Sequence, residues 1–290
     1  MKLNYYLTVN LAPNIIEIDD ICMTKMFLVI GEDKAVLIDC GIGLGNVYEY
    51  VRTLTDKPLS VIITHGHLDH AMGSGSFPDD VPVYMSPLDD YIYPEHTALD
   101  KRMGYFHGNK LFSLGLKGLF IKDDNLDWIT PASLDRFLPL NVGDTFDLGN
   151  EVLRICPGAG HTKGCITVLF EKARILLLGD AINGGTFLFD DYSLPVSELK
   201  KTLMQLKEET DGKYDKALFC HGMNGKPGFG DVNTVNGGIW LCDAILEGRD
   251  KKIKTKRMGK DCYMTKKFMS KEDIGDGSTC NIIYSDFTNQ

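Results

Sequence analysis

Four residues of types that commonly bind metal ions occur within one short segment, as His65, His67, Asp69 and His70. They directly follow Val61–Thr64, a continuous β-branched run typical of a strand that is buried on both faces. Because alternate residues of an extended chain point the same way, His65 and His67 can converge on one point. Imidazole and carboxylate together suit Zn²⁺ or Fe rather than Ca²⁺ or Mg²⁺. We therefore predict a transition-metal site at the end of this strand, the alternative being a set of unrelated surface or core histidines.

Three further candidate ligands occur where later strands are expected to end. Asp180 follows the apolar run Ile175–Leu178, and His221 follows Ala217–Cys220. His161 lies in a glycine-containing turn between two expected strands. Several histidines are costly to bury unless something pairs with them. Their repeated occurrence at strand ends favours the metal site over unrelated histidines.

Several motifs resemble those of one family, the metallo-β-lactamase superfamily. Residues 64–70, Thr-His-Gly-His-Leu-Asp-His, resemble its HxHxDH signature, and residues 160–164 look like its GHTxG turn. Residues 178–180 and 220–222 look like its later ligand segments, and residues 36–41 resemble its early LIDxG strand. The resemblance covers roughly residues 10–246, and the combination in this order is highly specific.

This resemblance implies an α/β fold, the αββα four-layer sandwich of two mixed β-sheets, with two Zn²⁺ ions per chain, or Fe or Mn in their place. The implied ligands are His65, His67 and His161 for one ion, Asp69, His70 and His221 for the other, and Asp180 as a bridge between the two. Asp39 would be an outer acceptor that orients a ligand histidine. The alternative for Asp39 is a turn-forming residue before Gly41.

The resemblance also implies a metal-dependent hydrolase. A bridging carboxylate at Asp180 is typical of the glyoxalase II, lactonase and tRNA-processing nuclease branches. A hydroxide shared by the two ions would attack a small thioester, ester or lactone. Asp69 would be the catalytic residue, as a ligand that also accepts or donates a proton. The alternatives are a phosphodiesterase or nuclease, a persulfide dioxygenase with one iron on His65, His161 and Asp180, and a non-catalytic binding protein.

Residues that select the substrate must lie outside the set of metal ligands. Residues 86–141 lack sustained periodicity and contain several aromatic and histidine side chains, including Tyr105 and His107. We interpret this segment as an irregular, partly helical insertion that forms a lid or an oligomer contact. Its aromatic residues could line a pocket or form its own core. Lys163 could meet a substrate carboxylate or be a solvated lysine, and Tyr192 could contact substrate or serve packing.

Alternating strand and helix patterns predict the α/β class. Strands are expected over residues 27–30, 35–38, 61–64, 81–85, 151–156, 165–170, 175–178 and 217–220, and helices over 46–54, 197–209 and 232–246. We expect residues 1–246 to form the catalytic domain. Residues 247–290 are expected to form a C-terminal tail packed on it, with a basic loop and a small hairpin, residues 261–268 and 280–284.

Composition narrows the class of protein. The 290 residues are 43% hydrophobic and 24% charged, which excludes a disordered chain or a coiled coil. A net charge of −9 argues weakly against nucleic acid as a partner, although residues 251–257 form one basic run.

No apolar run approaches the ~20 residues that span a bilayer. Without a recognisable signal peptide, we expect a cytoplasmic protein with free, buried cysteines. The expected partner is a small-molecule substrate, and a homo-oligomer is allowed.

Overall fold

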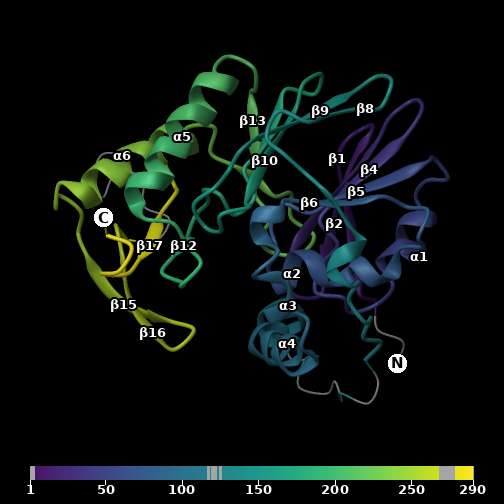
Figure 1. Cartoon of the computed structure of the whole chain (residues 1–290), viewed down its shortest axis with the longest axis horizontal. Coiled ribbons are helices and arrows are strands. Elements are labelled where there is room, and N and C mark those ends of the chain that lie inside the picture. The colour runs from purple at the N-terminus through teal and green to yellow at the C-terminus, as the bar shows by residue number, and fades with distance from the viewer. Residues whose placement is uncertain (1–3, 116–117, 119–122, 124–125, 268–277, 290) are drawn as a thin grey trace. The chain divides into compact units, whose positions relative to one another are not determined.

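The structure, a computed structural model, describes residues 4–115, 118, 123, 126–267 and 278–289. The chain divides into two compact units, and each contains its own sheet and helices (Figure 1). The first unit comprises the chain up to Asn141 together with Asp147–Glu151 and Cys220–Gly228. The second comprises Val142–Phe146, Val152–Phe219 and the chain from Phe229 onward. The C-terminal segment therefore belongs to the second unit.

The first unit is built on a mixed seven-stranded sheet whose strands are in sequence order. The strands are β1 (Tyr6–Ala12), β2 (Ile15–Asp20), β3 (Lys25–Ile30), β4 (Ala35–Ile38), β5 (Leu59–Ile62), β6 (Val83–Met85) and β7 (Phe137–Pro139). The pairs from β1 to β4 are antiparallel, and those from β4 to β7 are parallel. The predicted hairpin β3–β4 is confirmed. So is the central, buried β5, although its ladder ends at Ile62 and the chain bends at residues 64–66.

Helical segments connect the strands of the first unit. They are α1 (Val47–Arg52), α2 (Leu68–Ala71), η1 (Met72–Ser76), η2 (Pro87–Asp89), α3 (Tyr93–His96), α4 (Leu99–Leu114) and η5 (Leu134–Arg136). The prediction of α1 is confirmed, and the Asn46 side chain caps it by accepting from the Glu49 amide. The prediction of an irregular, partly helical insertion did not locate α4, a 16-residue helix. Leu99 and Leu111 of α4 are exposed, so its apolar residues do not form the one-sided stripe that marks a surface helix.

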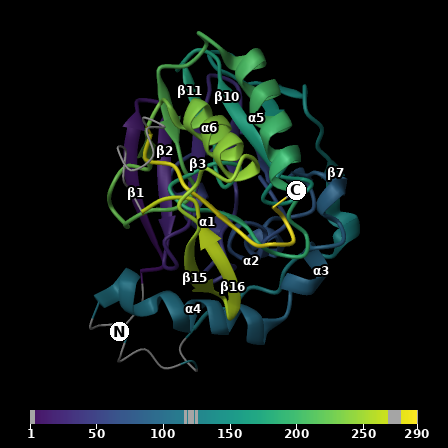
Figure 2. The ribbon, with the colours of Figure 1, turned by 90° about the vertical axis from the view of Figure 1, so that its left-hand side faces the viewer.

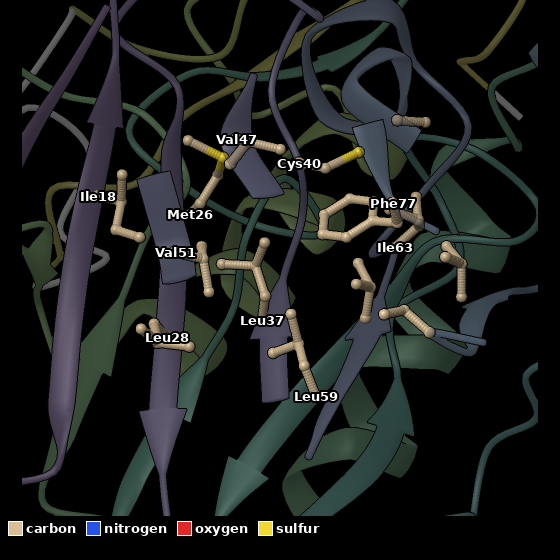
Figure 3. Close-up of a cluster of buried hydrophobic side chains, with 14 of the residues drawn as sticks. Ile18, Met26, Leu28, Leu37, Cys40, Val47, Val51, Leu59, Ile63 and Phe77 are labelled. Carbon is tan, nitrogen blue, oxygen red and sulfur yellow. The ribbon is translucent and has the colours of Figure 1, made fainter. Parts of the chain in front are cut away.

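The core of the first unit lies between the sheet and α1. Val47 and Val51 of α1 pack over Leu28 and Leu37 of the central strands, and all four side chains are fully buried (Figure 3). Burying each such side chain contributes roughly 1.5–3 kcal/mol relative to leaving it in water. This rigid layer fixes β4 and β5, whose carboxyl ends lead into Asp39 and the histidine segment.

The second unit contains a six-stranded and a four-stranded sheet. The first has the order β14-β13-β11-β10-β9-β8, with β8 (Thr145–Asp147), β9 (Val152–Pro157), β10 (Ile166–Phe170), β11 (Ile175–Leu177), β13 (Lys216–Leu218) and β14 (Phe229–Gly230). The second has the order β12-β17-β16-β15, with β12 (Thr186–Leu188), β15 (Ile253–Arg257), β16 (Lys260–Met264) and β17 (Ile282–Tyr284). Helices α5 (Val196–Thr210) and α6 (Thr234–Leu246) run beside each other (Figure 2).

Both helices of the second unit were predicted, as were strands β9, β10, β11 and β13. Leu199, Leu203 and Leu206 of α5 are buried in one core with residues of the sheet and α6. The tail differs from its prediction because the expected basic loop is strand β15, paired antiparallel with β16. Lysines are common on edge strands because their charge discourages pairing with another chain. The predicted segment 261–268 forms β16, but its last residue lies outside the described part of the chain.

All eight cysteines are free and buried, as predicted. Their positions in the cores fit the role of small apolar side chains. Among the described residues, no helix combines the length and the apolar character needed to span a membrane.

Candidate metal centre

The histidine segment lies between β5 and the short helix α2. His67 occupies the position before the first helical residue, with extended backbone angles (φ −71°, ψ 158°). The chain bends at residues 64–66, and His65 Nε2 and His67 Nδ1 lie only 3.1 Å apart. Gly66 between them donates its amide to Asp89 Oδ2 at 2.9 Å, and a Cβ atom there would lie 3.2 Å from the Asp89 Cβ. The predicted convergence of the two imidazoles is thus present.

The nitrogen spacing suits zinc. Tetrahedral Zn²⁺ with Zn–N distances of about 2.0–2.1 Å places neighbouring ligand nitrogens roughly 3.3 Å apart. The His65 and His67 nitrogens, at 3.1 Å, already lie near that separation. The other His65 nitrogen, Nδ1, is 3.1 Å from Thr64 Oγ1, so an outer hydroxyl contacts the ring nitrogen that does not meet His67. The donor set and its outer contacts therefore fit a transition-metal ion.

Asp39 orients His70. Asp39 Oδ2 lies 2.8 Å from His70 Nδ1, and both side chains are fully buried. The same carboxylate accepts the Thr64 amide at 2.7 Å and the Thr64 hydroxyl at 2.9 Å. Asp39 has a left-handed backbone (φ 63°), a conformation that Asp tolerates better than most residues. The arrangement matches the predicted outer acceptor, because a bond at Nδ1 leaves Nε2 as the ligand atom.

A second group of donors converges on Asp69. Its Oδ2 atom is 3.7 Å from His70 Nε2 and 3.6 Å from His221 Nε2. These three ligand atoms lie within 4.8 Å of one another, and Asp69 and His70 are buried. His221 reaches this position because residues 220–228 belong to the first unit, where Thr24 and His221 form an isolated antiparallel bridge. The first unit thus brings together three of the predicted ligands around one point.

Two hydroxyl groups also form hydrogen bonds with the Asp69 carboxylate. Tyr105, on α4, donates its hydroxyl to Asp69 Oδ2 at 2.7 Å, and Thr24 Oγ1 lies 3.3 Å from the same atom. Burial, reinforced by the Asp69 carboxylate, raises the pKa of Tyr105 well above its usual value of 10. The phenol therefore stays protonated and acts as a donor. Donation of this kind stabilises the ionised carboxylate.

In the second unit, His161 and Asp180 lie close together. His161 Nε2 is 3.9 Å from Asp180 Oδ2, and both side chains are almost fully buried. His161 donates Nδ1–H to the Phe187 carbonyl of β12 at 2.7 Å, which again leaves Nε2 as the ligand atom. Asn183 donates to Asp180 Oδ1 at 3.2 Å. Both predicted ligands of this unit are therefore held by neutral groups.

The predicted substrate residues are placed differently from one another. Tyr105 contacts Asp69, whereas His107, two residues along α4, forms a half-exposed ion pair with Asp123 at 3.0 Å. Lys163 is exposed, and Tyr192 is partly buried in the loop after β12. Other aromatic residues of the insertion pack against the rest of the unit; Phe106, for example, is fully buried in a cluster with Ile21, Cys22, Ile42 and Leu44. Phe106 and Tyr93 join cores that include residues outside the insertion, so neither a pocket lining nor a core of the insertion alone describes them.

Sequence reasoning did not assign a site role to three residues near the histidines. Thr24 contacts Asp69, and the ring of His96 lies 5.1 Å from the ring of His67. Burial lowers the pKa of His96. The Cys220 thiol lies 3.6 Å from Asp39 Oδ2. Cys220 is adjacent to His221 in sequence, but no local pattern could have placed Thr24 or His96.

Solved structures share this fold. A metallo-beta-lactamase from Pontibacter korlensis superimposes with a TM-score of 0.57 at 17% identity, covering 82% of this chain and 99% of that one. The metallo-beta-lactamase FIM-1 from Pseudomonas aeruginosa gives 0.57 at 15% identity, covering 84% of this chain and 97% of that one. These likenesses confirm the predicted fold class, the metallo-β-lactamase fold with its mixed β-sheets.

Sequence comparison adds the family. The model of the metallo-beta-lactamase superfamily matches residues 19–221, and the chain belongs to that superfamily. A relative from Bos taurus, acyl-coenzyme A thioesterase MBLAC2, is 26% identical over 211 residues, covering 68% of this chain and 72% of that protein. An uncharacterized protein from Aquifex aeolicus is 25% identical over 188 residues, covering 61% of this chain and 73% of that protein. The predicted membership is therefore confirmed, and with it a metal-dependent hydrolase superfamily and groups of residues able to bind metal.

Proposed function

We propose that this protein is a dinuclear metal-dependent hydrolase that cleaves a small acyl thioester. The observation that carries the proposal is the convergence of Asp69 Oδ2 with His70 Nε2 and His221 Nε2 at 3.6–3.7 Å. The choice of a thioester over an ester or lactone is supported by the relative named as an acyl-coenzyme A thioesterase. A small-molecule thioester is accordingly the proposed partner.

The proposed ligand assignment follows the family motifs. One ion is assigned to His65, His67 and His161, the other to Asp69, His70 and His221, and Asp180 to both. When bound, such ions lower the pKa of water and polarise a carbonyl oxygen. Zinc is proposed because imidazole and carboxylate ligands, several of which have an outer hydrogen-bond partner, are typical of its sites.

The protein's own side chains have separable tasks in this proposal. Asp39 keeps His70 in the tautomer that presents Nε2 to the metal, and the Phe187 carbonyl does the same for His161. The Tyr105 hydroxyl, by donating to Asp69 Oδ2, keeps that oxygen ionised and fixes its direction. Asp69 is then able to accept a proton during hydrolysis as well as bind metal.

Metal analysis combined with a substrate panel tests the proposal. Purified protein should contain close to two zinc ions per chain and hydrolyse an acyl-coenzyme A or acyl-glutathione thioester faster than a lactone or a phosphodiester. Asp69→Asn should abolish this rate, whereas the matched control Asp79→Asn, at a fully exposed carboxylate, should not. One iron per chain with oxygen-dependent persulfide oxidation would replace the hydrolase by a dioxygenase. Preferential phosphodiester cleavage would favour a nuclease.

A further inference from the structure

A fully buried group of charged residues lies between strands β2 and β3 of the first unit. Lys25 Nζ is 2.8 Å from Glu17 Oε1 and 2.7 Å from Asp19 Oδ1, and all three residues are inaccessible to solvent. Burying charges costs free energy that ion pairing only partly offsets. One ammonium between two carboxylates leaves the group short of positive charge. Further hydrogen-bond donors are therefore needed around it.

The loop of residues 220–228, here named the His221 loop, provides partners for both kinds of charge. Lys25 Nζ donates to the Lys226 carbonyl at 2.9 Å and lies 3.4 Å from the Met223 carbonyl. Each bond occupies a backbone group of a loop that forms no helix or strand ladder. Bonds to a charged partner are stronger than those between neutral groups. The ammonium thus fixes the middle of the loop.

The two carboxylates hold the same loop through its amides. The Gly225 amide donates to Asp19 Oδ2 at 2.5 Å, and the Gly228 amide donates to Glu17 Oε2 at 2.7 Å. The three charged side chains therefore bind carbonyls and amides alternately along the loop. Ordering the backbone of a loop costs conformational entropy, which these bonds offset.

The backbone of Lys25 also holds the start of the loop. The Lys25 amide donates to the Cys220 carbonyl at 2.7 Å, beside the bridge between Thr24 and His221. A Cβ atom at Gly222 would lie 2.9 Å from Lys25 Cε, so the loop passes directly against the lysine side chain. Residue 25 therefore fixes the chain on both sides of His221.

We propose that Lys25, Glu17 and Asp19 form a charged anchor that positions His221, which makes Lys25 a positioning residue for the ion that His221 binds. The inference rests on the proposed function, because it takes His221 as a metal ligand. It assigns Lys25 no contact with substrate or metal. Its role is to order the loop before metal binds, so that the imidazole does not pay that entropy on binding.

The test uses the full chain with Lys25→Met and, in case unpaired carboxylates prevent folding, the triple variant Lys25→Met, Glu17→Gln, Asp19→Asn. In metal-free protein, hydrogen exchange across residues 221–228 should become faster. Zinc titration against a chelator should show the affinity for one of two ions falling about 10- to 100-fold. This is the usual range when a metal ligand loses a group that holds it in position. The matched control Lys201→Met, which removes an exposed ion pair with Glu198, should change neither.

A double-mutant cycle with His221→Ala separates positioning from a general structural role. If the anchor acts through His221, adding Lys25→Met, or the triple variant, to His221→Ala should cause no further loss of zinc affinity. An additive loss, or unchanged affinity in folded anchor variants while His221→Ala loses an ion, overturns the anchor and leaves the hydrolase intact. Full retention of both ions by His221→Ala overturns the ligand assignment itself and the anchor with it.

Discussion

The two units hold their candidate ligands with different kinds of group. In the first unit, the carboxylate of Asp39 accepts hydrogen bonds from His70 and from Thr64, next to the histidine segment. In the second, His161 is fixed by the Phe187 carbonyl and Asp180 by the Asn183 amide. His70 is thus held by a buried charge, whereas the groups named here for His161 and Asp180 are neutral.

This difference between the units predicts how strongly each one responds to substitutions around its ligands. A hydrogen bond to an ionised acceptor is stronger than one between neutral groups, and removing a buried charged partner leaves more groups unsatisfied. The first unit should therefore respond more strongly to changes around its ligands, and more strongly to pH. The second should respond mainly to changes in the ligands themselves.

The largest effects are expected from the ligands, one in each unit. His70→Ala and Asp180→Ala should each lower kcat/KM by more than roughly 100-fold, which is the largest loss usually seen when a group that orients a ligand is removed. Each variant should also release at least one ion. Steady-state kinetics and metal analysis on the same preparations measure both. Retention of two ions and near-normal rates in either variant would contradict the assignment of that residue.

The next largest effect is expected at Asp39. Asp39→Asn keeps the shape and tolerates the left-handed backbone, but its amide cannot accept from both Thr64 and His70. We expect zinc affinity to fall about 10- to 100-fold and the free energy of unfolding to fall by about 1–3 kcal/mol. Chelator competition and urea unfolding measure these changes. An unchanged affinity would show that Asp39 is only a turn-forming residue.

A smaller effect is expected at Asn183, the neutral counterpart in the second unit. Asn183→Ala removes the donor to Asp180 and the acceptor of the Gly185 amide. The loss should be about 1 kcal/mol, equivalent to roughly fivefold in zinc affinity. The same chelator assay measures it beside Asp39→Asn. If Asn183→Ala costs as much as Asp39→Asn, the contrast between charged and neutral support is wrong.

The smallest effect concerns pH. Burial raises the pKa of Asp20 from its usual 3.8 to about 6. The folded protein therefore binds a proton more tightly than the unfolded chain, and stability falls as pH rises between 3.8 and about 6. For the metal-free protein this costs about 1 kcal/mol between pH 5 and pH 7.

Comparison with a neutral variant tests this pH dependence. In Asp20→Asn, an amide oxygen can still accept the Cys22 and Thr24 amides, which both bond to the same Asp20 oxygen. Urea unfolding at a series of pH values should show a flatter dependence for this variant between pH 5 and pH 7. Equal slopes in the two proteins would remove Asp20 as the cause.

Local sequence patterns were enough to predict much of the fold. Hairpin β3–β4 was predicted from two apolar runs joined by a turn, and helices α1, α5 and α6 were predicted from apolar residues that recur at helical spacing. The convergence of His65 and His67 was also predicted, although from an extended chain, whereas the chain bends at residues 64–66. The grouping of Asp69, His70 and His221 was expected from the resemblance.

Other features had no local signal. Helix α4 was missed because its apolar side chains do not form one stripe, and β15 was missed because its lysines suggest a solvated loop rather than a paired edge strand. The contact of Tyr105 with Asp69, and the separation of His107 from it, depend on which face of α4 meets the unit. No spacing rule distinguishes two residues of an unrecognised helix.

The sequence by itself determined which residues could bind metal and that they follow strands, because residue type and strand periodicity are local properties. Only the tertiary structure decided which other groups hold these side chains in position. Asp39 meets His70, and Lys25 meets the His221 loop, through contacts between distant parts of the chain. Such contacts are set by strand pairing and core packing over the whole unit, because a buried charge must find its partners wherever the fold brings them.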